Sequence, residues 1–101
     1  MITFDSAKSI ALKTIKREGA TLEMELTLAE DETLEEDFGW VFFYTSVKWL
    51  ETNDLKYAIA GNAPFIIDRY TGHLELAGTA HEISHYIKLY RRYGTCHPIE
   101  E

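Results

Sequence analysis

The sequence predicts an α+β domain in which an antiparallel sheet of about four strands packs against an N-terminal and a C-terminal helix. Three observations favour this class. An amphipathic segment with helical spacing stands near each end, the middle of the chain is rich in aromatic and β-branched residues, and glycines separate the segments. A chain of 101 residues supports at most a single core of one or two layers, so residues 1–101 are expected to form a single domain.

Residues 3–18 are predicted to form the first helix. Thr3 is suited to capping its N-terminus, and Gly19 is expected to end it. Apolar residues at helical spacing share the face that would contact the sheet, namely Phe4, Ala7, Ala11 and Ile15.

Residues 20–28 alternate between apolar and polar side chains, which predicts a half-buried strand. Six of the eight residues in 30–37 are acidic, and this stretch has no apolar period. We therefore expect it to be a solvated loop.

Residues 40–49 are apolar on both faces and predict a central strand. Residues 50–62 are more polar and predict a connection that contains at most one helical turn. A hairpin is expected next, with strands at 63–68 and 73–76 and with Gly72 in a left-handed position of the turn.

Thr79 and Glu82 have the spacing of a capping box, which predicts that the second helix begins there and continues to about Tyr93. Gly94 is expected to end this helix. Its inward stripe comprises Ile83, Tyr86, Ile87 and Tyr90. Residues 95–101 are expected to be a flexible tail.

Residues 81–85 read His-Glu-Ile-Ser-His and match the HExxH pattern of zinc hydrolases. At about 100° per residue, however, His81 and His85 fall opposite the apolar stripe and are expected to face solvent. A catalytic zinc needs three protein ligands, and the later candidates all lie on the tail. We therefore expect no enzyme activity, no metal site and no cofactor, with a zinc hydrolase as a remote alternative and adventitious metal binding by the two histidines left open.

Two other pairs of chemically active residues have simpler explanations. Cys96 and His97 are adjacent in sequence, and neighbouring side chains rarely orient as nucleophile and base, so the thiol is read as incidental. Asp68 and His73 flank the hairpin turn, where a structural hydrogen bond is favoured over an acid–base pair.

Charge and hydropathy narrow the possible partners. Seventeen acidic residues against ten Lys and Arg give a formal net charge of −7, which disfavours nucleic-acid binding and favours a basic protein partner. Apolar runs such as residues 40–44 and 63–67 fall far short of the ~20 residues that span a bilayer. The N-terminal residues do not resemble a secretion signal, so a cytoplasmic location is expected.

The strand predicted at residues 40–49 leaves one question open. If both helices pack on the same face of the sheet, its other face is an exposed aromatic patch; otherwise a helix or the 50–62 connection covers it. The residues expected to contact a partner are the acidic run, for electrostatic steering, and two candidate aromatic anchors: Asp31, Glu32, Glu35, Glu36, Asp37, Trp40 and Trp49.

Residues 60–68, with the sequence Ala-Gly-Asn-Ala-Pro-Phe-Ile-Ile-Asp, are followed by Thr-Gly at 71–72 and by Gly-Thr-Ala at 78–80. Together with the Gly-Trp-Val-Phe-Phe segment at 39–43, this pattern resembles the immunity protein 35 family over roughly residues 38–90. The residues that carry the family pattern are expected to shape turns and strand ends: Gly61, Asn62, Pro64, Asp68, Gly72 and Thr79.

The resemblance implies a bacterial immunity protein that binds and neutralises a cognate toxin by non-covalent blockade, without catalysis of its own. A basic toxin would suit the negative net charge. The alternative is a small chaperone-like or general interaction domain that uses an exposed aromatic patch. Both a monomer and a homodimer are compatible with the sequence.

Overall fold

The computed structural model describes residues 1–23, 25–54, 64–78 and 80–98. The α+β class and the overall order of elements are confirmed. The elements in chain order are α1 (Phe4–Leu22), β1 (Leu26–Leu28), the 3-10 helix η1 (Glu30–Glu32), β2 (Leu34–Glu36), β3 (Gly39–Phe42), β4 (Tyr44–Ser46), α2 (Val47–Thr52), β5 (Phe65–Asp68), β6 (Leu74–Leu76) and α3 (Ile83–Tyr93).

The strands form two antiparallel sheets. The larger sheet has the order β2-β3-β5-β6, and the smaller sheet pairs β1 with β4. In the larger sheet, Trp40 lies opposite Ile67 and Val41 lies opposite Ile66, so neighbouring residues of β3 and β5 point to alternate faces together.

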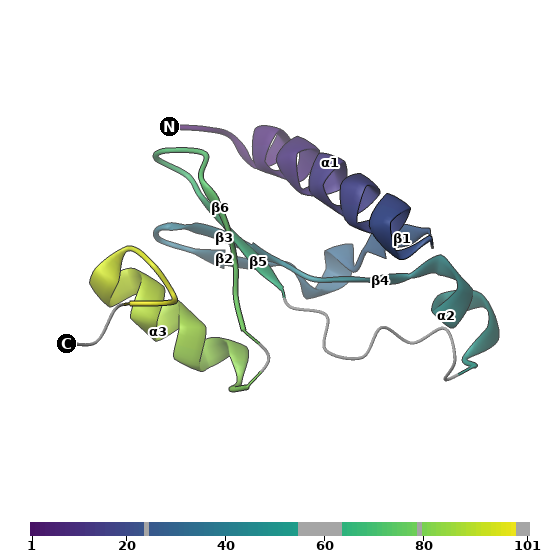
Figure 1. Ribbon diagram of the computed structural model, residues 1–101. Helices are drawn as coiled ribbons and strands as arrows, with labels where there is room; N and C mark the ends of the chain where they lie inside the picture. Colours follow the sequence, from purple (N-terminus) through teal and green to yellow (C-terminus); the bar gives the residue numbers. More distant parts are fainter. Residues whose placement is uncertain (24, 55–63, 79, 99–101) are drawn as a thin grey trace.

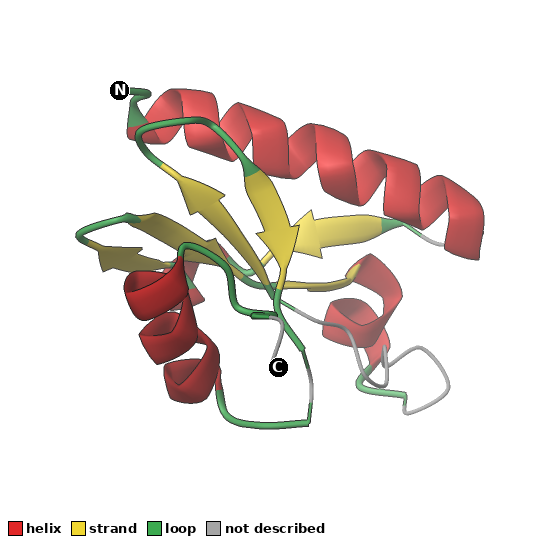
Figure 2. Ribbon diagram, turned by 60° about the vertical axis from the view of Figure 1, so that its left-hand side comes forward, coloured by secondary structure: helices red, strands yellow, loops and turns green. Residues whose placement is uncertain are grey.

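The two long helices cover opposite faces of the larger sheet. Figure 1 shows α1 on one side of the strands and α3 on the other, and Figure 2 shows the same layering from a second direction. One core lies beneath α1 and contains Ala7, Ala11, Ile15, Leu28, Trp40, Phe42, Phe65 and Ile67. The other lies beneath α3 and contains Phe38, Val41, Ile66, Ala77, Tyr86, Ile87, Tyr90 and Cys96. The expectation of a single core is therefore wrong, because the sheet separates the buried residues into two clusters.

This layering answers the question that the sequence leaves open. The apolar residues of β3 alternate between the two cores, and each core is closed by its own helix. An exposed aromatic face on this strand, the basis of the chaperone-like alternative, is therefore absent from the described part of the chain.

The first helix begins as predicted but ends later. The Thr3 hydroxyl accepts a hydrogen bond from the Ser6 amide at 3.2 Å, which confirms the cap. The helix continues through Gly19 to Leu22 and ends at Glu23, which adopts a left-handed conformation with φ of 55°. Alanine and leucine favour helix strongly enough to offset one interior glycine. The strand predicted at 20–28 is therefore wrong for residues 20–22 and is confirmed only as β1; Met24 lies outside the described residues.

The strand predicted at 40–49 is interrupted and shortened. It divides into β3 and β4 at Phe43, and it ends at Ser46. The Ser46 hydroxyl accepts a hydrogen bond from the Trp49 amide at 3.0 Å and caps α2, so Trp49 lies on a helix instead of a strand. The short helix accounts for the single helical turn expected near residue 50.

The acidic run is more ordered than its composition suggests. Residues 30–32 form η1, and residues 34–36 form the edge strand β2, in which Glu35 lies opposite Trp40. A prediction of loop structure is therefore wrong for these residues. An edge strand gains its stability from backbone pairing with one neighbour, so it can form without an apolar period.

The β5–β6 hairpin is confirmed. Gly72 has φ of 75°, and the Asp68 carboxylate accepts hydrogen bonds from the Tyr70 and Thr71 amides at 2.8 and 3.2 Å. Gly61 and Asn62 lie outside the described residues, as does the start of the predicted strand at residue 63.

The last helix starts later than predicted. Glu82 is the N-cap residue of α3 and makes no capping bond with its side chain, so the proposed capping box is wrong; Thr79 itself lies outside the described residues. Gly94 ends the helix with φ of 72°, as expected. The inward stripe is also confirmed, with Tyr86, Ile87 and Tyr90 buried and Ile83 partly buried.

The residues that follow α3 are not a loose tail as far as the structure describes them. Thr95, Cys96 and His97 all form hydrogen bonds with β6, and Cys96 is only 1% exposed. In the part of the chain that the structure covers, no helix combines the length and apolar character needed to cross a membrane.

Candidate partner-binding surface

A hollow of about 620 Å³ joins the start of the acidic run to α2. One side consists of η1, and the other consists of β4 and the first part of α2. The lining residues are Leu28, Ala29, Glu30, Asp31, Glu32, Tyr44, Thr45, Trp49 and Leu50. We call this feature the acidic hollow, because carboxylates and large apolar side chains border the same open space.

Backbone bonds hold η1 in place beside the hollow. The Ala29 amide donates to the Phe43 carbonyl at 2.8 Å, and the Glu32 and Thr33 amides close the 3-10 turn. The Lys8 ammonium lies 2.7 Å from the Glu30 carboxylate and ties η1 to α1. Asp31 and Glu32, the other two residues of η1, are both exposed.

The two tryptophans expected as anchors lie in different environments. Trp49 is partly exposed and lines the hollow. Trp40 is only 5% exposed, because the Phe4 ring contacts it edge-on at 5.9 Å between centroids and the Arg69 guanidinium covers it at 5.0 Å. The structure therefore leaves Trp49 as the accessible aromatic side chain of the pair.

The acidic run also divides into two groups. Within the described residues, Asp31 and Glu32 form no ion pair, whereas the three later carboxylates do. Glu35 lies 3.2 Å from Arg69, and both Glu36 and Asp37 bind Arg91 of α3, at 2.5 and 3.1 Å.

The contacts of Arg91 shift its pKa and also join two elements of the fold. The hydrogen bond and charge of Asp37, assisted by Glu36, raise the pKa of the Arg91 guanidinium. These contacts connect the turn between β2 and β3 to the C-terminal half of α3. Glu36 and Asp37 therefore contribute to the negative field, but their carboxylates are already engaged within the fold.

The His-Glu-x-x-His segment does not form the arrangement of a zinc hydrolase. His81 and Glu82 precede α3, so the two histidines are not successive ligands on one helix face. Both rings are exposed, as predicted, and their centroids are 4.2 Å apart. Among the residues that the structure describes, no carboxylate, thiol or imidazole joins them as a third ligand.

Asp68 and His73 flank the hairpin turn, but their side chains bind different partners. The Asp68 carboxylate accepts a hydrogen bond from the Tyr90 hydroxyl at 3.0 Å, and the His73 ring lies 3.7 Å from Glu75. Between Asp68 and His73 themselves, the bond runs from the Asp68 amide to the His73 carbonyl at 2.9 Å. An acid–base pair is therefore not formed.

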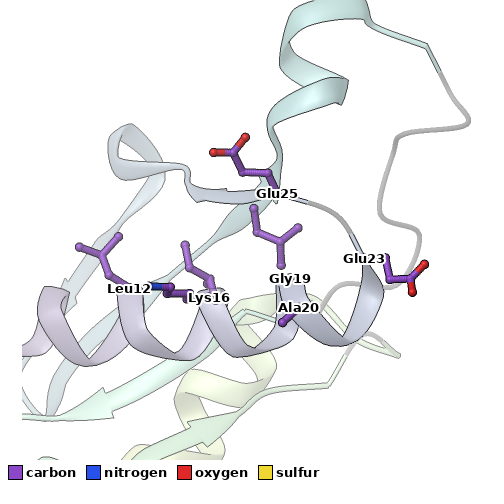
Figure 3. A pocket seen from close by; sticks show the side chains of 8 residues that line it. Leu12, Lys16, Gly19, Ala20, Glu23 and Glu25 are labelled. Carbon is purple, nitrogen blue, oxygen red and sulfur yellow. The ribbon is translucent and has the colours of Figure 1, made fainter.

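A second hollow, of about 720 Å³, lies between the C-terminal half of α1 and β1. In Figure 3, Leu12 and Lys16 border it from the helix, Glu25 lies on the strand side, and Glu23 points away. Its walls are mainly apolar, and its charged groups are solvent-exposed. Without an aromatic anchor among its lining residues, it is a weaker candidate for partner binding than the acidic hollow.

Comparison with known proteins places these features in a family. Residues 5–86 match the immunity protein 35 family, and this range contains the acidic hollow and the β5–β6 hairpin. The chain belongs to the immunity protein 35 family. The resemblance seen in the sequence is thus confirmed.

This immunity protein 35 family member is also similar to the uncharacterized protein YrhB of Escherichia coli strain K12. The two chains are 42% identical over 52 residues, which is 52% of this chain and 55% of the relative. The chain therefore spans about half the length of this curated relative. No solved structure matches the chain.

Of the residues that carry the family pattern, those that the structure describes have structural roles. Asp68 and Gly72 shape the hairpin turn, and the Pro64 carbonyl accepts a hydrogen bond from the Ala77 amide at 2.9 Å. The other three, Gly61, Asn62 and Thr79, lie outside the described residues.

Sequence reasoning missed one cluster altogether. Glu75 of β6 lies beside Cys96 and His97, and one potential metal-binding atom from each residue falls within 4.8 Å of the others. Glu75 is about 20 positions away in sequence, so no motif spacing identifies the group. The neighbouring Cys-His dipeptide was its only sequence signal.

Proposed function

We propose that this protein is an immunity protein that binds one cognate bacterial toxin through the acidic hollow and blocks it without covalent chemistry. Membership of the immunity protein 35 family supports a toxin partner. The observation that favours this surface is the placement of the Asp31 and Glu32 carboxylates, unpaired among the described residues, beside the partly exposed ring of Trp49.

The hollow combines the two features that specific protein interfaces use. An aromatic side chain with a partly open face supplies a large contact area at its centre. Leu50, which is 60% exposed, extends the apolar surface next to it. The carboxylates at the rim raise the rate of encounter with a basic partner and orient it.

The size of the molecule suits blockade. A stable interface of standard size buries about 1,600 Å² in total, or about half of that on each partner. The accessible surface of the protein is 6731 Å², so an interface of this kind would occupy a modest part of it. Inhibition by blockade requires only this interface, and the rest of the protein surface need not contact the toxin.

The negative field indicates the chemistry of the partner. Toxins that act on nucleic acids carry basic surfaces that attract phosphates, and an acidic protein can occupy such a surface. The formal net charge of −7 and the carboxylates of the hollow both favour a toxin of this kind. We therefore propose a basic toxin as the partner.

Co-expression tests the proposal. Cells that express a toxin encoded beside this protein should survive with the wild type and die with Trp49→Ala, while purified Trp49→Ala should keep its fold but lose the complex in size-exclusion chromatography. Tyr70→Ala is the matched control, because Tyr70 is also an exposed aromatic residue but lies on the β5–β6 turn. It should protect as the wild type does.

Two results would contradict the proposal. Full protection by Trp49→Ala would remove the acidic hollow as the binding surface. Equal protection against unrelated toxins, or equal binding to many unfolded proteins, would indicate a general interaction domain instead of a dedicated inhibitor.

A further inference from the structure

Three side chains of types that bind transition metals converge between β6 and the segment after α3. They are the carboxylate of Glu75, the thiol of Cys96 and the imidazole of His97, with one ligand atom of each within 4.8 Å of the others. They come from two parts of the chain that the fold brings together, on the sheet face that α3 covers.

The three residues differ in exposure in a way that suits a site at the edge of a core. Cys96 is 1% exposed, the Glu75 side chain is 17% exposed, and His97 is exposed. A metal ion could therefore reach the group from the His97 side while its thiol ligand remains sheltered from solvent and from oxidants.

Hydrogen bonds already orient the carboxylate toward the thiol. Oε1 of Glu75 accepts bonds from the Cys96 amide at 2.6 Å, the Cys96 thiol at 2.9 Å and the Thr95 hydroxyl at 2.8 Å. Binding of a metal by the thiol would replace only the thiol proton in this network. The bonds from the Cys96 amide and Thr95 would continue to hold Glu75 in position.

His73, directly before β6, lies beside Glu75 but outside this group of three. Nε2 of His73 lies 3.7 Å from Oε2 of Glu75, the carboxylate oxygen that does not contact Cys96. Movement of the His73 ring toward Cys96 and His97 would complete a set of one thiolate, one carboxylate and two imidazoles.

The His97 ring also has the outer contact that metal-binding histidines commonly make. Its Nε2 lies 2.7 Å from the Leu76 carbonyl oxygen. This contact holds the ring beside β6, and contacts between a ring nitrogen and a backbone carbonyl orient ligand rings in many zinc sites.

We propose that Glu75, Cys96 and His97 form a zinc site, with His73 as the fourth ligand. A mixed set of sulfur, nitrogen and oxygen ligands suits Zn²⁺, which accepts all three in tetrahedral geometry. Zinc would displace the proton of the Cys96 thiol to solvent and would join the C-terminal segment to β6. This site is separate from the acidic hollow and does not depend on the proposed function.

Cobalt substitution tests the proposal, because Co²⁺ reports its ligands by absorption. The protein is purified without a histidine tag and titrated with Co²⁺. A thiolate ligand should produce a sulfur-to-cobalt charge-transfer band in the near ultraviolet, together with the intense visible bands of tetrahedral cobalt. Addition of Zn²⁺ should remove both.

Matched variants separate this site from the exposed histidine pair. Cys96→Ser should abolish the charge-transfer band and weaken zinc binding by roughly 100-fold or more, and Glu75→Gln and His73→Ala should each weaken it by roughly tenfold or more. The double variant His81→Ala/His85→Ala should retain the band and the affinity. Zinc should raise the midpoint of thermal unfolding of the wild type and of this double variant, but not that of Cys96→Ser.

Other outcomes would overturn the proposal. One is cobalt binding without a charge-transfer band, lost on removal of His81 and His85, which would place the metal at the histidine pair. The other is the absence of zinc binding in competition with a weak chelator. Far-ultraviolet circular dichroism of each metal-free variant should match the wild type, and Cys96→Ala provides a second thiol-free variant should Cys96→Ser not fold.

Discussion

The Tyr90 hydroxyl donates a hydrogen bond to Oδ2 of Asp68 at 3.0 Å, and this contact connects the C-terminal half of α3 to the end of β5. The other carboxylate oxygen of Asp68 accepts hydrogen bonds from the Tyr70 and Thr71 amides of the turn. One carboxylate therefore organises the hairpin and holds the helix above it.

Removal of this contact should destabilise the protein without changing its fold. Tyr90→Phe keeps the aromatic ring in the core but loses a hydrogen bond to a charged acceptor, so the free energy of unfolding should fall by about 1–2 kcal/mol. Urea unfolding measures the change. Tyr93→Phe is the control, because Tyr93 is 52% exposed, and it should leave the midpoint almost unchanged. Equal midpoints for Tyr90→Phe and the wild type would show that the bond contributes nothing.

The same tyrosine predicts a loss of stability at alkaline pH. Burial, the hydrogen bond and charge of Asp68, and the charges of Glu75 and Cys96 all raise the pKa of Tyr90 above its usual value of about 10. Its contribution to stability is therefore complete below pH ~10 and is lost as the pH rises further, because only the unfolded state ionises readily.

A pair of unfolding series measures this effect. The difference in unfolding free energy between the wild type and Tyr90→Phe should be constant from pH 7 to about pH 9 and should shrink above pH ~10. Subtracting the unfolding free energy of Tyr90→Phe from that of the wild type at each pH removes the contributions of the other titrating groups. A difference that grew with pH would have the wrong sign and would refute the assignment.

Gly39 should tolerate no side chain. Its φ is 150°, and a Cβ atom there would overlap the Ile67 carbonyl oxygen and lie 3.0 Å from the Arg69 amide nitrogen. Both atoms belong to the backbone of β5 and its turn, so they cannot move aside. Gly39→Ala should cost about 3 kcal/mol or more, or prevent folding.

Gly94→Ala is the control for the glycine prediction. Gly94 also has a positive φ, of 72°, but a Cβ atom at this position would have no neighbour within 4 Å among the described residues. Only the left-handed conformation opposes a side chain there, at about 1–2 kcal/mol. Urea midpoints of the two variants should therefore differ clearly, and equal losses would contradict the close approach of β3 and β5 at Gly39.

The two tryptophans should separate stability from binding. Trp40→Ala removes a buried ring from the core under α1 and should cost about 3–5 kcal/mol in urea unfolding. Trp49→Ala removes a partly exposed ring and should cost about 1 kcal/mol or less. A larger loss of stability at Trp49 than at Trp40 would contradict the described burial of these residues.

Electrostatic steering should depend on the acidic hollow. Asp31→Lys/Glu32→Lys should slow association with the toxin and reduce the dependence of the association rate on salt, because it reverses the charges at the rim. Stopped-flow kinetics at several ionic strengths measures both. Glu82→Lys is the control: Glu82 is exposed beside α3, outside the hollow, and its reversal should have a clearly smaller effect per charge. If reversing the charges of Asp31 and Glu32 left the association rate unchanged, η1 would only connect β1 to β2 and would have no role in steering.

Local signals in the sequence were sufficient for several elements. Thr3 marks the start of α1, Gly72 marks the hairpin turn, and Gly94 marks the end of α3. In each case, the residue type suits its local backbone: the Thr3 hydroxyl accepts a bond from a nearby amide, and Gly72 and Gly94 adopt left-handed conformations. The inward stripe of α3 was also predictable, because helical spacing alone defines it.

Signals that depend on competition between neighbouring segments were less reliable. Residues 20–22 alternate as a strand would, yet they extend α1, and residues 34–36 have no apolar period, yet they pair with β3. The sequence predicted that acidic residues and a tryptophan would bind the partner, but not which of them would line the acidic hollow. Trp49 lines the same hollow as η1 because α2 begins directly after β4, and Trp40 is covered by Arg69 from the β5–β6 turn.

The amino-acid order alone determined the α+β class, the main turns and the family relationship, because these depend on periodicity and on residues close together in the chain. The tertiary structure decided which helix covers which face of the sheet, which tryptophan remains accessible, and that Glu75, Cys96 and His97 meet. Such outcomes depend on how distant segments pack, and contacts between residues about 20 or more positions apart leave no local pattern in the sequence.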